Sequence, residues 1–452
     1  MSDVHDAQRL MELQHLPLDR KIQITQTRII EFYQHFNGQV CVSFSGGKDS
    51  TVLLHIARQL FPEIPAVFSN TGLEYPEIQR FVKTFDHVDI VTPAMNFSEV
   101  VSNYGYPLIG KEVAEAIHYA RRIRSQSPKV ERERERTIMQ KREELLSKRV
   151  ARRIAERFSA VLGERHPHTH THNCETNRVQ RNSTRETKQK REELSGQRTK
   201  QAGVAPNGRT GEGGVFSNPA EQFGAKSQFN KEKYLPLARD VPVLISHLCC
   251  HRMKKSPMHK YQHANNYKPI LATLAEESRV RKQAWIRHGC NAFEGKNPMS
   301  QPMSFWTEQD VLAYIVKYDL PIASVYGGIV SIDEDGFPYP PKDVMGNIGC
   351  NLQCTGCQRT GCIYCAFGMH LEKGKTRFQR LAETHPRQYE FCIMGGQWAD
   401  NPRHDPTAPE YDGDWKNWNP KQIWVPSKKG LGMGKVFDLV NEIYGKDFYR
   451  YE

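Results

Sequence analysis

A glycine loop between an apolar run and an amphipathic helix is the feature that most restricts how this chain of 452 residues can fold. Residues 40–44 are mostly apolar, and the next six read Ser45-Gly46-Gly47-Lys48-Asp49-Ser50. Val52, Leu53, Ile56, Ala57 and Leu60 then recur on one helical face. Glycines let the backbone turn tightly, and the N-terminus of the following helix adds a partial positive charge. The sequence therefore predicts a strand, an anion-binding turn and a helix.

The pattern of strand and helix continues on both sides of this loop. Residues 22–36 have helical periodicity, residues 66–68 and 88–91 read as strands, and a proline opens a helix over 76–85. Further strands are expected at 241–246 and 269–274, and helices at 278–287, 307–318 and 435–444. Alternating strands and helices are typical of a parallel sheet covered on both faces. We therefore expect an α/β fold with a doubly wound, mostly parallel sheet.

Two well-known phosphate loops do not match the glycine turn. A Walker A loop needs a glycine where this chain has Val42 and a Ser or Thr where it has Asp49. No G-x-G-x-x-G fingerprint follows the first strand. A tight turn with an incidental lysine remains as the structural alternative.

Composition changes abruptly after residue 120. Residues 121–160 are dense in Arg and Glu, and residues 163–230 are polar with little to bury. The first stretch predicts a long exposed helix or a helical hairpin, and the second predicts a disordered or loosely ordered segment. The whole chain carries a formal charge of +12 with a pI near 9.1. It has no run of 18 apolar residues, so we expect no membrane segment and a cytoplasmic location.

The motif Ser45–Ser50 resembles the SGGxDS pyrophosphate loop of the PP-loop (adenine nucleotide alpha hydrolase) superfamily. Four other segments resemble its phosphoadenosine phosphosulfate reductase-like branch, the sulfonucleotide reductases: residues 69–76, 248–257, 275–281 and 302–311. The first of these has Asn70 where the family has Asp, and the third lacks a glycine and an arginine. The resemblance covers residues 1–120 and about 234–370, and leaves the basic insertion unmatched.

The resemblance implies a four-part organisation. Residues 1–120 would form the first half of the PP-loop nucleotide-binding domain, and residues 234–375 its second half with a cysteine region. Residues 121–233 would be a charged insertion, and residues 376–452 a loop-rich and helical cap.

The resemblance also implies a site for ATP or an adenylyl-sulfate nucleotide. Lys48, Asp49 and Arg281 are expected as catalytic groups, because Lys and Arg match phosphate oxygens. The expected nucleotide-binding residues are Ser43, Ser45, Gly46, Gly47, Lys48, Asp49, Ser50, Asn70, Thr71, Gly72, Lys111, Glu277, Ser278 and Arg279.

Five cysteines recur at short spacing near the end of the matched region: Cys350, Cys354, Cys357, Cys362 and Cys365. Two C-x-x-C pairs indicate ligation, and spacing alone suits zinc or an iron–sulfur cluster equally. The resemblance implies a 4Fe-4S cluster on Cys249, Cys250, Cys362 and Cys365. The alternative is a zinc knuckle without Cys249 and Cys250, and the roles of Cys350, Cys354 and Cys357 stay open.

The expected activity is ATP-dependent adenylation of a substrate oxygen with release of pyrophosphate, assisted by Mg²⁺ and serving sulfur transfer. Sulfonucleotide reductases carry a C-terminal E-C-G-x-H segment, whereas the last cysteine here is Cys392. A covalent reductase mechanism would therefore lack its usual thiolate. A sulfur-donor protein is a further expected partner.

Two alternatives remain open at this stage. One is a true sulfonucleotide reductase that makes sulfite. The other is a protein that binds nucleic acid through the basic insertion without catalysis, since Lys and Arg neutralise phosphates; nucleic-acid thiolation would combine binding with chemistry. The interleaved acids Glu131, Glu133 and Glu135 fit a solvated charged helix equally well.

Overall fold

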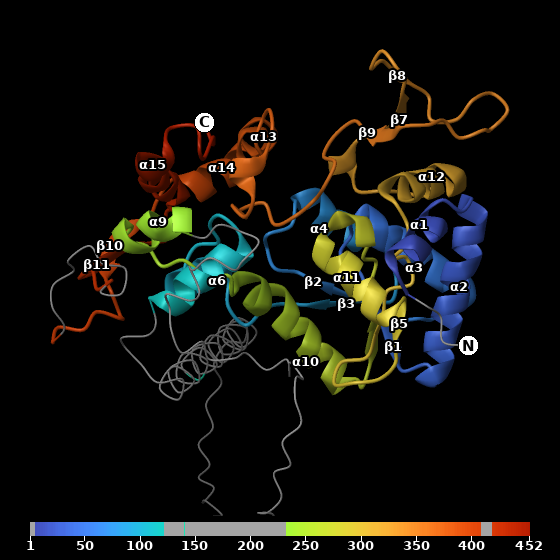
Figure 1. Ribbon diagram of the computed structural model, residues 1–452, viewed down its shortest axis with the longest axis horizontal. Coiled ribbons are helices and arrows are strands. Elements are labelled where there is room, and N and C mark those ends of the chain that lie inside the picture. The colour runs from blue at the N-terminus through green and yellow to red at the C-terminus, as the bar shows by residue number, and fades with distance from the viewer. Residues whose placement is uncertain (1–4, 122–139, 141–231, 408–417) are drawn as a thin grey trace, which may run out of the picture. The chain divides into compact units, whose positions relative to one another are not determined.

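The computed structural model describes residues 5–121, 140, 232–407 and 418–452 (Figure 1). Except for Gln140, these residues belong to one compact unit. Most of the insertion expected at 121–233, with its predicted helix and disorder, lies outside the described residues. No helix in the described ranges is long and apolar enough to span a bilayer.

A six-stranded sheet forms the centre, in the order β3-β2-β1-β4-β6-β5. Only β5 runs antiparallel to its neighbour, which confirms the expected α/β class with a mostly parallel, helix-flanked sheet. The strands are β1 (Val40–Ser43), β2 (Ala66–Ser69), β3 (Val88–Val91), β4 (Lys268–Ile270), β5 (Asn291–Ala292) and β6 (Met299–Ser300).

The central strands are apolar because both faces of the sheet are covered. Val40, Cys41 and Val42 in β1 are fully buried, and so are Ala66 and Val67 in β2. The helices beside this sheet are α1 (Ala7–Gln14), α2 (Leu18–His35), α3 (Lys48–Leu60), α4 (Pro76–Val82), α10 (Ser256–Ala264), α11 (Arg279–His288) and α12 (Glu308–Tyr318). The stripe predicted for residues 52–60 packs inward: Val52, Leu53, Ile56 and Ala57 in α3 are fully buried.

The strand expected at residues 241–246 is wrong. Val243 makes a single bridge to Trp424 and Ile245 a single bridge to Tyr106, so the segment joins two other elements instead of entering the sheet. The run at 269–274 forms a strand only through Ile270, after which Leu271 donates to Ser300 and the chain turns into a 3₁₀ turn, η4 (Ala275–Glu277).

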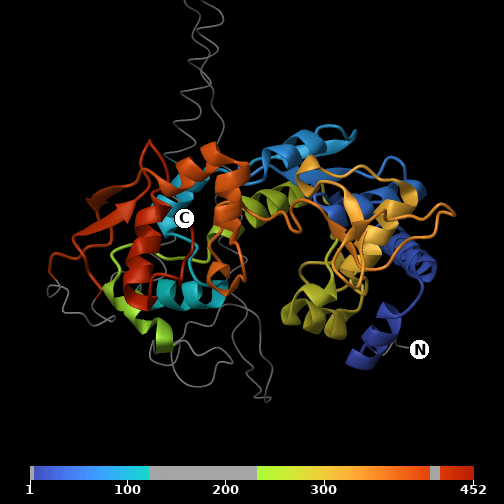
Figure 2. The ribbon, with the colours of Figure 1, turned by 90° about the horizontal axis from the view of Figure 1, so that it is seen from above.

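The C-terminal elements pack beside segments from the first half of the chain, as the cyan and red ribbons of Figure 2 show. The Tyr106 hydroxyl donates to the carbonyl of Leu431, and the Ile109 N–H donates to the Tyr449 hydroxyl. The elements of this region are α5 (Phe97–Tyr104), α6 (Lys111–Ala120), η2 (Glu232–Tyr234), α9 (Leu235–Asp240), η6 (Met369–Leu371), α13 (Arg377–Thr384), α14 (Pro386–Ile393), β10 (Gln397–Asp400), β11 (Gln422–Val425) and α15 (Met433–Tyr444).

Arg121 fixes the two ends of the insertion to each other. Its buried guanidinium donates to the carbonyls of Leu237, Ala238, Val241 and Val243, and it lies 4.2 Å from the centroid of the Trp418 ring. Five donors in a planar fork suit a site where several carbonyls converge. The base of the insertion is therefore part of the folded unit.

A small antiparallel sheet, ordered β8-β7-β9, follows α12 and the turn η5 (Ser324–Tyr326). Its strands are β7 (Ile329–Ile332), β8 (Pro338–Tyr339) and β9 (Leu352–Cys354). Strand β9 leads directly into the cysteine-rich segment, and Leu352 is tied to α12 through both its N–H and its carbonyl by the Gln309 amide.

Candidate nucleotide and cysteine site

The glycine turn lies between the end of β1 and the start of α3, as predicted. Gly46 has φ +71°, in the left-handed region that disfavours any residue with a Cβ. A Cβ at this position would lie 2.7 Å from Val82 Cγ2 and 2.8 Å from Ile78 Cγ2. Ser50 braces the turn, because its hydroxyl donates to the Gly47 carbonyl and accepts from the Ser45 N–H.

Lys48 is buried at the first position of α3, and three groups surround its ammonium. Its Nζ atom lies 2.9 Å from Glu308 Oε1 and 5.4 Å from the centroid of the Tyr326 ring. The Cys354 thiol lies within hydrogen-bonding reach, and burial raises the pKa of that thiol. Burial raises the pKa of Tyr326, and the Thr360 hydroxyl and the Lys48 backbone N–H partly offset this effect. The lysine is thus held by contacts at the mouth of the turn.

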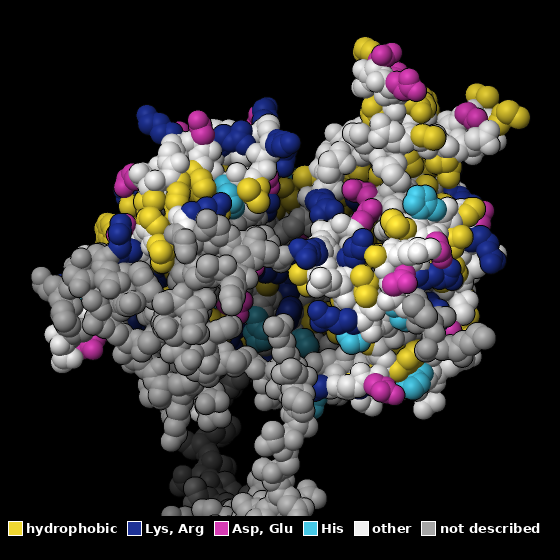
Figure 3. Space-filling view, viewed as in Figure 1, with side chains coloured by type: hydrophobic (Ala, Val, Ile, Leu, Met, Phe, Trp, Pro, Cys, Tyr) yellow, Lys and Arg dark blue, Asp and Glu magenta, His cyan; other side chains and the backbone are white. Residues whose placement is uncertain are grey.

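The charges around Asp49 alternate in sign. Burial raises the pKa of Asp49, and the nearby cations of Lys48, Arg359 and Arg281 partly offset this effect. Arg281 forms an ion pair with Glu277, and Arg359 approaches the same carboxylate at 3.8 Å. Lys and Arg side chains gather over α11 in Figure 3, with acidic side chains beside them. Cations and carboxylates are therefore interleaved at the glycine turn.

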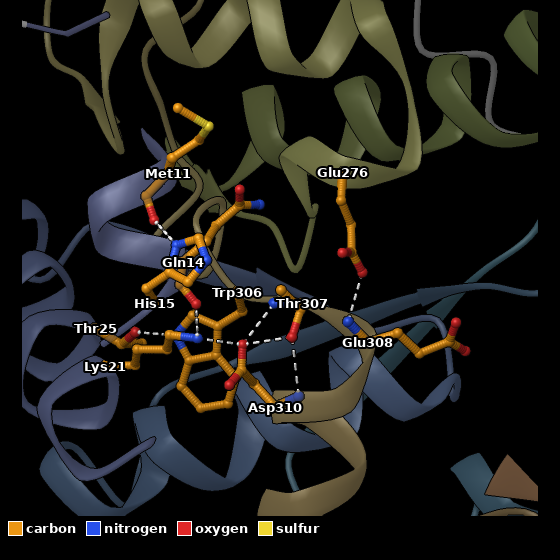
Figure 4. Close-up of polar contacts among 10 residues, drawn as sticks. All are labelled: Met11, Gln14, His15, Lys21, Thr25, Glu276, Trp306, Thr307, Glu308 and Asp310. Atoms are coloured by element: carbon orange, nitrogen blue, oxygen red, sulfur yellow. Dashed lines mark hydrogen bonds and ion pairs between the residues drawn. The ribbon is translucent and has the colours of Figure 1, made fainter. Parts of the chain in front are cut away.

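The N-terminus of α12 holds Glu308 in place (Figure 4). Thr307 and Asp310 form a capping box at the start of the helix expected at 307–318, with the Thr307 hydroxyl 2.7 Å from Asp310 Oδ2. The buried Lys21 donates to the same Asp310 oxygen at 2.6 Å and to the Gln14 carbonyl. The Glu308 N–H donates to Glu276. These contacts fix the N-terminus of α12, and so fix the position of Glu308, its first residue, which pairs with Lys48.

Two adjoining hollows open at the turn. The loop hollow, of about 230 Å³, is lined by Ser45 and residues 47–49 of the turn together with Glu277, Glu308, Tyr326 and residues 358–361. The strand hollow, of about 170 Å³, lies over the ends of β1 and β2 and is lined largely by apolar side chains such as Phe44, Val67 and Tyr75. Both are lined by Ser45, Thr360 and Gly361. Larger surface hollows occur elsewhere, but they do not touch the turn.

Ser43 presents an unpartnered polar atom to the strand hollow. Its hydroxyl oxygen is buried and has no hydrogen-bond partner among the residues that the structure describes. A buried hydroxyl without a partner is costly, so such a group at a hollow indicates a ligand that would bond to it. The strand hollow therefore combines apolar walls with a polar group available for recognition.

The segment after β2 forms a compact turn beside this hollow. The buried Glu74 accepts from the Thr71 N–H and from the Thr71 hydroxyl, and the Gly72 N–H donates to Asn70. Lys254 lies 3.7 Å from Glu74 Oε1 and also lines the strand hollow. It belongs to η3 (His251–Lys255), a π-helical turn before α10. Such turns occur frequently at functional sites.

The structure brings together the four cysteines expected as cluster ligands. Cys249 and Cys250 interact electrostatically with Cys362 and Cys365, although more than 100 residues separate the two pairs. The hydrogen bond with Cys249 and the charges of Lys111 and Lys254 lower the pKa of Cys250 to about 6. The hydrogen bond with Cys250 and burial raise the pKa of Cys249. Burial also raises the pKa of the Cys362 and Cys365 thiols, so Cys250 is the one member of this group whose pKa is lowered. Soft sulfur donors near cations suit a metal or cluster.

The remaining cysteines of the motif lie elsewhere. Cys354 contacts Lys48, the Cys357 thiol lies 3.7 Å from the Tyr75 hydroxyl, and Cys350 is exposed. Among the residues that the structure describes, no three Cys, His, Asp or Glu side chains converge as ligands of a single ion. A four-iron cluster has no such common point, since each cysteine binds a separate iron atom.

Six of the fourteen residues expected around a nucleotide line the two hollows: Ser43, Ser45, Gly47, Lys48, Asp49 and Glu277. Gly46, Ser50, Asn70, Thr71 and Gly72 lie in the adjoining turns without lining either hollow, and Arg281, expected as a catalytic group, lines neither. The other three expected residues also lie outside the hollows. Lys111 lies beside the cysteines. Ser278 caps α11 through the Arg281 N–H, and Arg279 is exposed; neither lines a hollow.

Several lining residues were not expected from the sequence: Glu74, Lys254, Glu308, Tyr326, Gln358, Arg359 and Thr360. Glu308 and Lys254 lie in segments that resemble the family, and this resemblance was the sequence signal that could have identified them. The sequence held no such signal for Tyr326 and Arg359.

Comparison with known proteins finds a similarity over the first half of the sheet. A model described as the phosphoadenosine phosphosulfate reductase domain matches residues 39–108. The match contains β1, the glycine turn, α3 and β2, so the resemblance predicted from the motif is confirmed in this segment.

Three relatives cover a similar share of the chain. An uncharacterized protein of Methanocaldococcus jannaschii is 30% identical over 94 residues, 20% of this chain and 23% of that protein. Sulfate adenylyltransferase subunit 2 of Rhizobium meliloti is 24% identical over 18% of this chain and 31% of its own. Phosphoadenosine 5'-phosphosulfate reductase of Salmonella arizonae is 24% identical over 18% of this chain and 34% of its own. The chain thus spans about a third of the length of these relatives or less.

Proposed function

We propose that this protein binds ATP at the two hollows and cleaves it to AMP and pyrophosphate while activating a substrate for sulfur transfer. The observation that supports this best is the shared wall at Ser45, where an anion-binding turn meets an apolar hollow with an unpartnered hydroxyl. An adenine nucleotide has the same two parts, an anionic tail and a flat apolar base. Together the hollows are comparable in size with small-molecule sites of about 300–1,000 Å³.

In this proposal the turn binds the two phosphates that leave as pyrophosphate. Backbone N–H groups at the start of α3 and the Lys48 ammonium would stabilise the charge that develops on the leaving group. An oxygen of the substrate attacks the α-phosphorus, the bond from that phosphorus to the bridging oxygen breaks, and the products are an adenylylated substrate and pyrophosphate. A sulfur nucleophile then displaces the adenylylated oxygen and AMP leaves; without a substrate, water in place of the substrate oxygen gives AMP directly. The printed name of the sulfate adenylyltransferase relative describes adenylyl transfer of this kind.

Asp49 and Glu308 are the carboxylates best placed to hold a Mg²⁺ ion together with the phosphates. Both line the loop hollow, and Mg²⁺ is commonly bound by one or two carboxylates plus substrate phosphate oxygens. The ion would neutralise part of the phosphate charge. We propose this role for the two side chains without assigning them further ligands.

The four grouped thiols fit an iron–sulfur cluster, and we propose Cys249, Cys250, Cys362 and Cys365 as its ligands. Their soft donors, and the cations Lys111 and Lys254 that would balance the charge of thiolates, favour this assignment. When bound, the cluster would supply a local charge or an iron site for sulfur. Lys254 connects the two regions, because it contacts Cys362 and also lines the strand hollow.

A true sulfonucleotide reductase is the second candidate, favoured by the name of the Salmonella relative. One assay separates the two. Purified protein is incubated with ATP labelled at the α-phosphate, and separately with adenylyl-sulfate plus a dithiol reductant. We expect AMP and pyrophosphate from ATP, strongly reduced in Lys48→Ala. Sulfite formation from adenylyl-sulfate with ATP left intact would contradict the proposal.

A further inference from the structure

A short segment crosses from the small antiparallel sheet to the cysteine pair and lies over the glycine turn. This strap, residues 355–361, begins after Cys354 at the end of β9 and ends before Cys362. Residues 358–361 line the loop hollow, so the segment forms one wall of the site. None of the residues expected around the nucleotide belongs to this strap.

Backbone contacts fix the first part of the strap. The Gly356 N–H donates to the Tyr326 carbonyl at 2.8 Å, and the Cys357 N–H donates to Val325 at 2.9 Å. A Cβ on Gly356 would lie 2.5 Å from the Val325 carbonyl oxygen, so only glycine permits this close approach.

Further contacts fix its other end. The hydroxyls of Thr360 and Tyr326 are 2.5 Å apart, and just past the strap the Ile363 N–H donates to the Leu73 carbonyl at 2.8 Å. The strap is therefore held on both sides of Arg359.

Arg359 extends from this strap to the charged wall of the loop hollow. Its guanidinium lies 3.8 Å from Glu277 Oε1, and its charge acts on Asp49 and on Glu276. Its side chain is 64% exposed, so it lies at the mouth of the hollow and remains accessible to a ligand. Arg281 pairs with the same Glu277 carboxylate.

The ion pairs indicate which positively charged side chains are available to bind an anionic ligand. Lys48 has the Glu308 carboxylate at 2.9 Å, whereas two arginines share the single carboxylate of Glu277. A phosphate group near Glu277 would meet two guanidinium forks that share this one carboxylate as ion-pair partner, while the carboxylates of Asp49 and Glu276 lie nearby. Planar forks of this kind bind phosphate oxygens in bidentate fashion.

We propose that Arg359 is a phosphate-contacting residue of the nucleotide site, and that the strap positions it there. The inference rests on the proposed function in one respect, that the ligand of the glycine turn is an adenine nucleotide. Arg359 binds the polyphosphate tail from the side opposite the turn, so that the tail is held by elements that lie about 300 residues apart in the sequence.

The test is equilibrium binding of the full-length chain, measured by calorimetry with MgATP and with adenosine. Arg359→Ala should weaken ATP binding by about ten- to a hundredfold, the effect of losing a hydrogen bond to a charged group, and leave adenosine binding within about twofold. Arg359→Lys, which keeps the charge and loses the fork, should fall between. Arg287→Ala is the matched control, because it removes an exposed arginine of α11 that lines neither hollow.

Three outcomes would overturn the assignment. Unchanged ATP affinity in Arg359→Ala would show that the side chain does not touch the phosphates. Equal losses for ATP and adenosine would show that it only maintains the fold. Equal losses in Arg359→Ala and Arg287→Ala would show an unspecific charge effect. A wild-type protein that binds ATP without forming AMP contradicts the proposed function alone, and the comparison of variants remains decisive for Arg359.

Discussion

Replacing Gly46 by alanine should disrupt the nucleotide site through the backbone. The left-handed conformation at φ +71° costs an L-residue about 1–2 kcal/mol. The new methyl group would lie 2.7 Å from Val82 Cγ2 and 2.8 Å from Ile78 Cγ2, and both side chains are buried in α4 and cannot move away easily. Crowding of this kind costs about 1–3 kcal/mol. We therefore expect Gly46→Ala to lower the free energy of unfolding by roughly 2–5 kcal/mol.

Urea unfolding followed by circular dichroism measures this change, and calorimetric titration with MgATP measures its effect on the site. The neighbouring Gly47 supplies the control. Its φ is −81°, which any residue adopts, and a Cβ there would lie 3.3 Å from the Ser45 and Tyr326 hydroxyls. Gly47→Ala should therefore change the free energy of unfolding by about 1 kcal/mol or less. If the two variants are equally stable, or if Gly46→Ala binds ATP as wild type does, the reasoning about the turn is refuted.

Three further predictions concern single side chains. Ser43→Ala removes an unpartnered buried hydroxyl, so urea unfolding should show stability unchanged or raised by up to about 1 kcal/mol while calorimetry shows severalfold weaker adenosine binding; a clear loss of stability would contradict this. Burial raises the pKa of Asp49, so its stabilising protonated form is present below the ordinary value of 3.8 and is lost as pH rises through the raised pKa. Asp49→Asn should then gain stability over wild type as pH increases from about 4 to 7, and a gap independent of pH would count against it. Cys362→Ser should lose iron and sulfide after anaerobic purification whereas Cys354→Ser retains them, and equal metal analyses would exclude the assignment.

The sequence was informative where function and local structure coincide. The glycine turn, the stripe of α3 and the helix that begins after Thr307 follow from patterns within a dozen residues, and the structure has each of them. The pairing of Cys249 with Cys362 came from resemblance, because spacing along the chain carries no information about segments 113 residues apart.

Long-range contacts explain what the sequence could not predict. Arg359 acquires its place through the strap and has no local motif that indicates a ligand. Helix α12 brings Glu308 to Lys48, and its signal in the sequence was the resemblance of residues 302–311 to the family. The apolar run at 241–246 resembled a strand, but Val243 and Ile245 pair with Trp424 and Tyr106 instead of with the central sheet. The apolar composition of this run correctly indicates that it is buried. Whether a buried run forms a strand depends on the backbone segment with which it pairs.

The hydrogen bonds by which Arg121 joins the two ends of the insertion have a consequence for protein engineering. Strand β1 pairs directly with β4, with Val40 opposite Lys268, so the sheet closes across more than 200 intervening residues. The entropy of closing such a loop rises by only about 0.6 kcal/mol for each doubling of its length. Because Arg121 joins the entry and exit of the insertion, residues 122–231 should be exchangeable for a short spacer with little change in the core. A shortened chain of this kind would be a practical starting point for crystallisation.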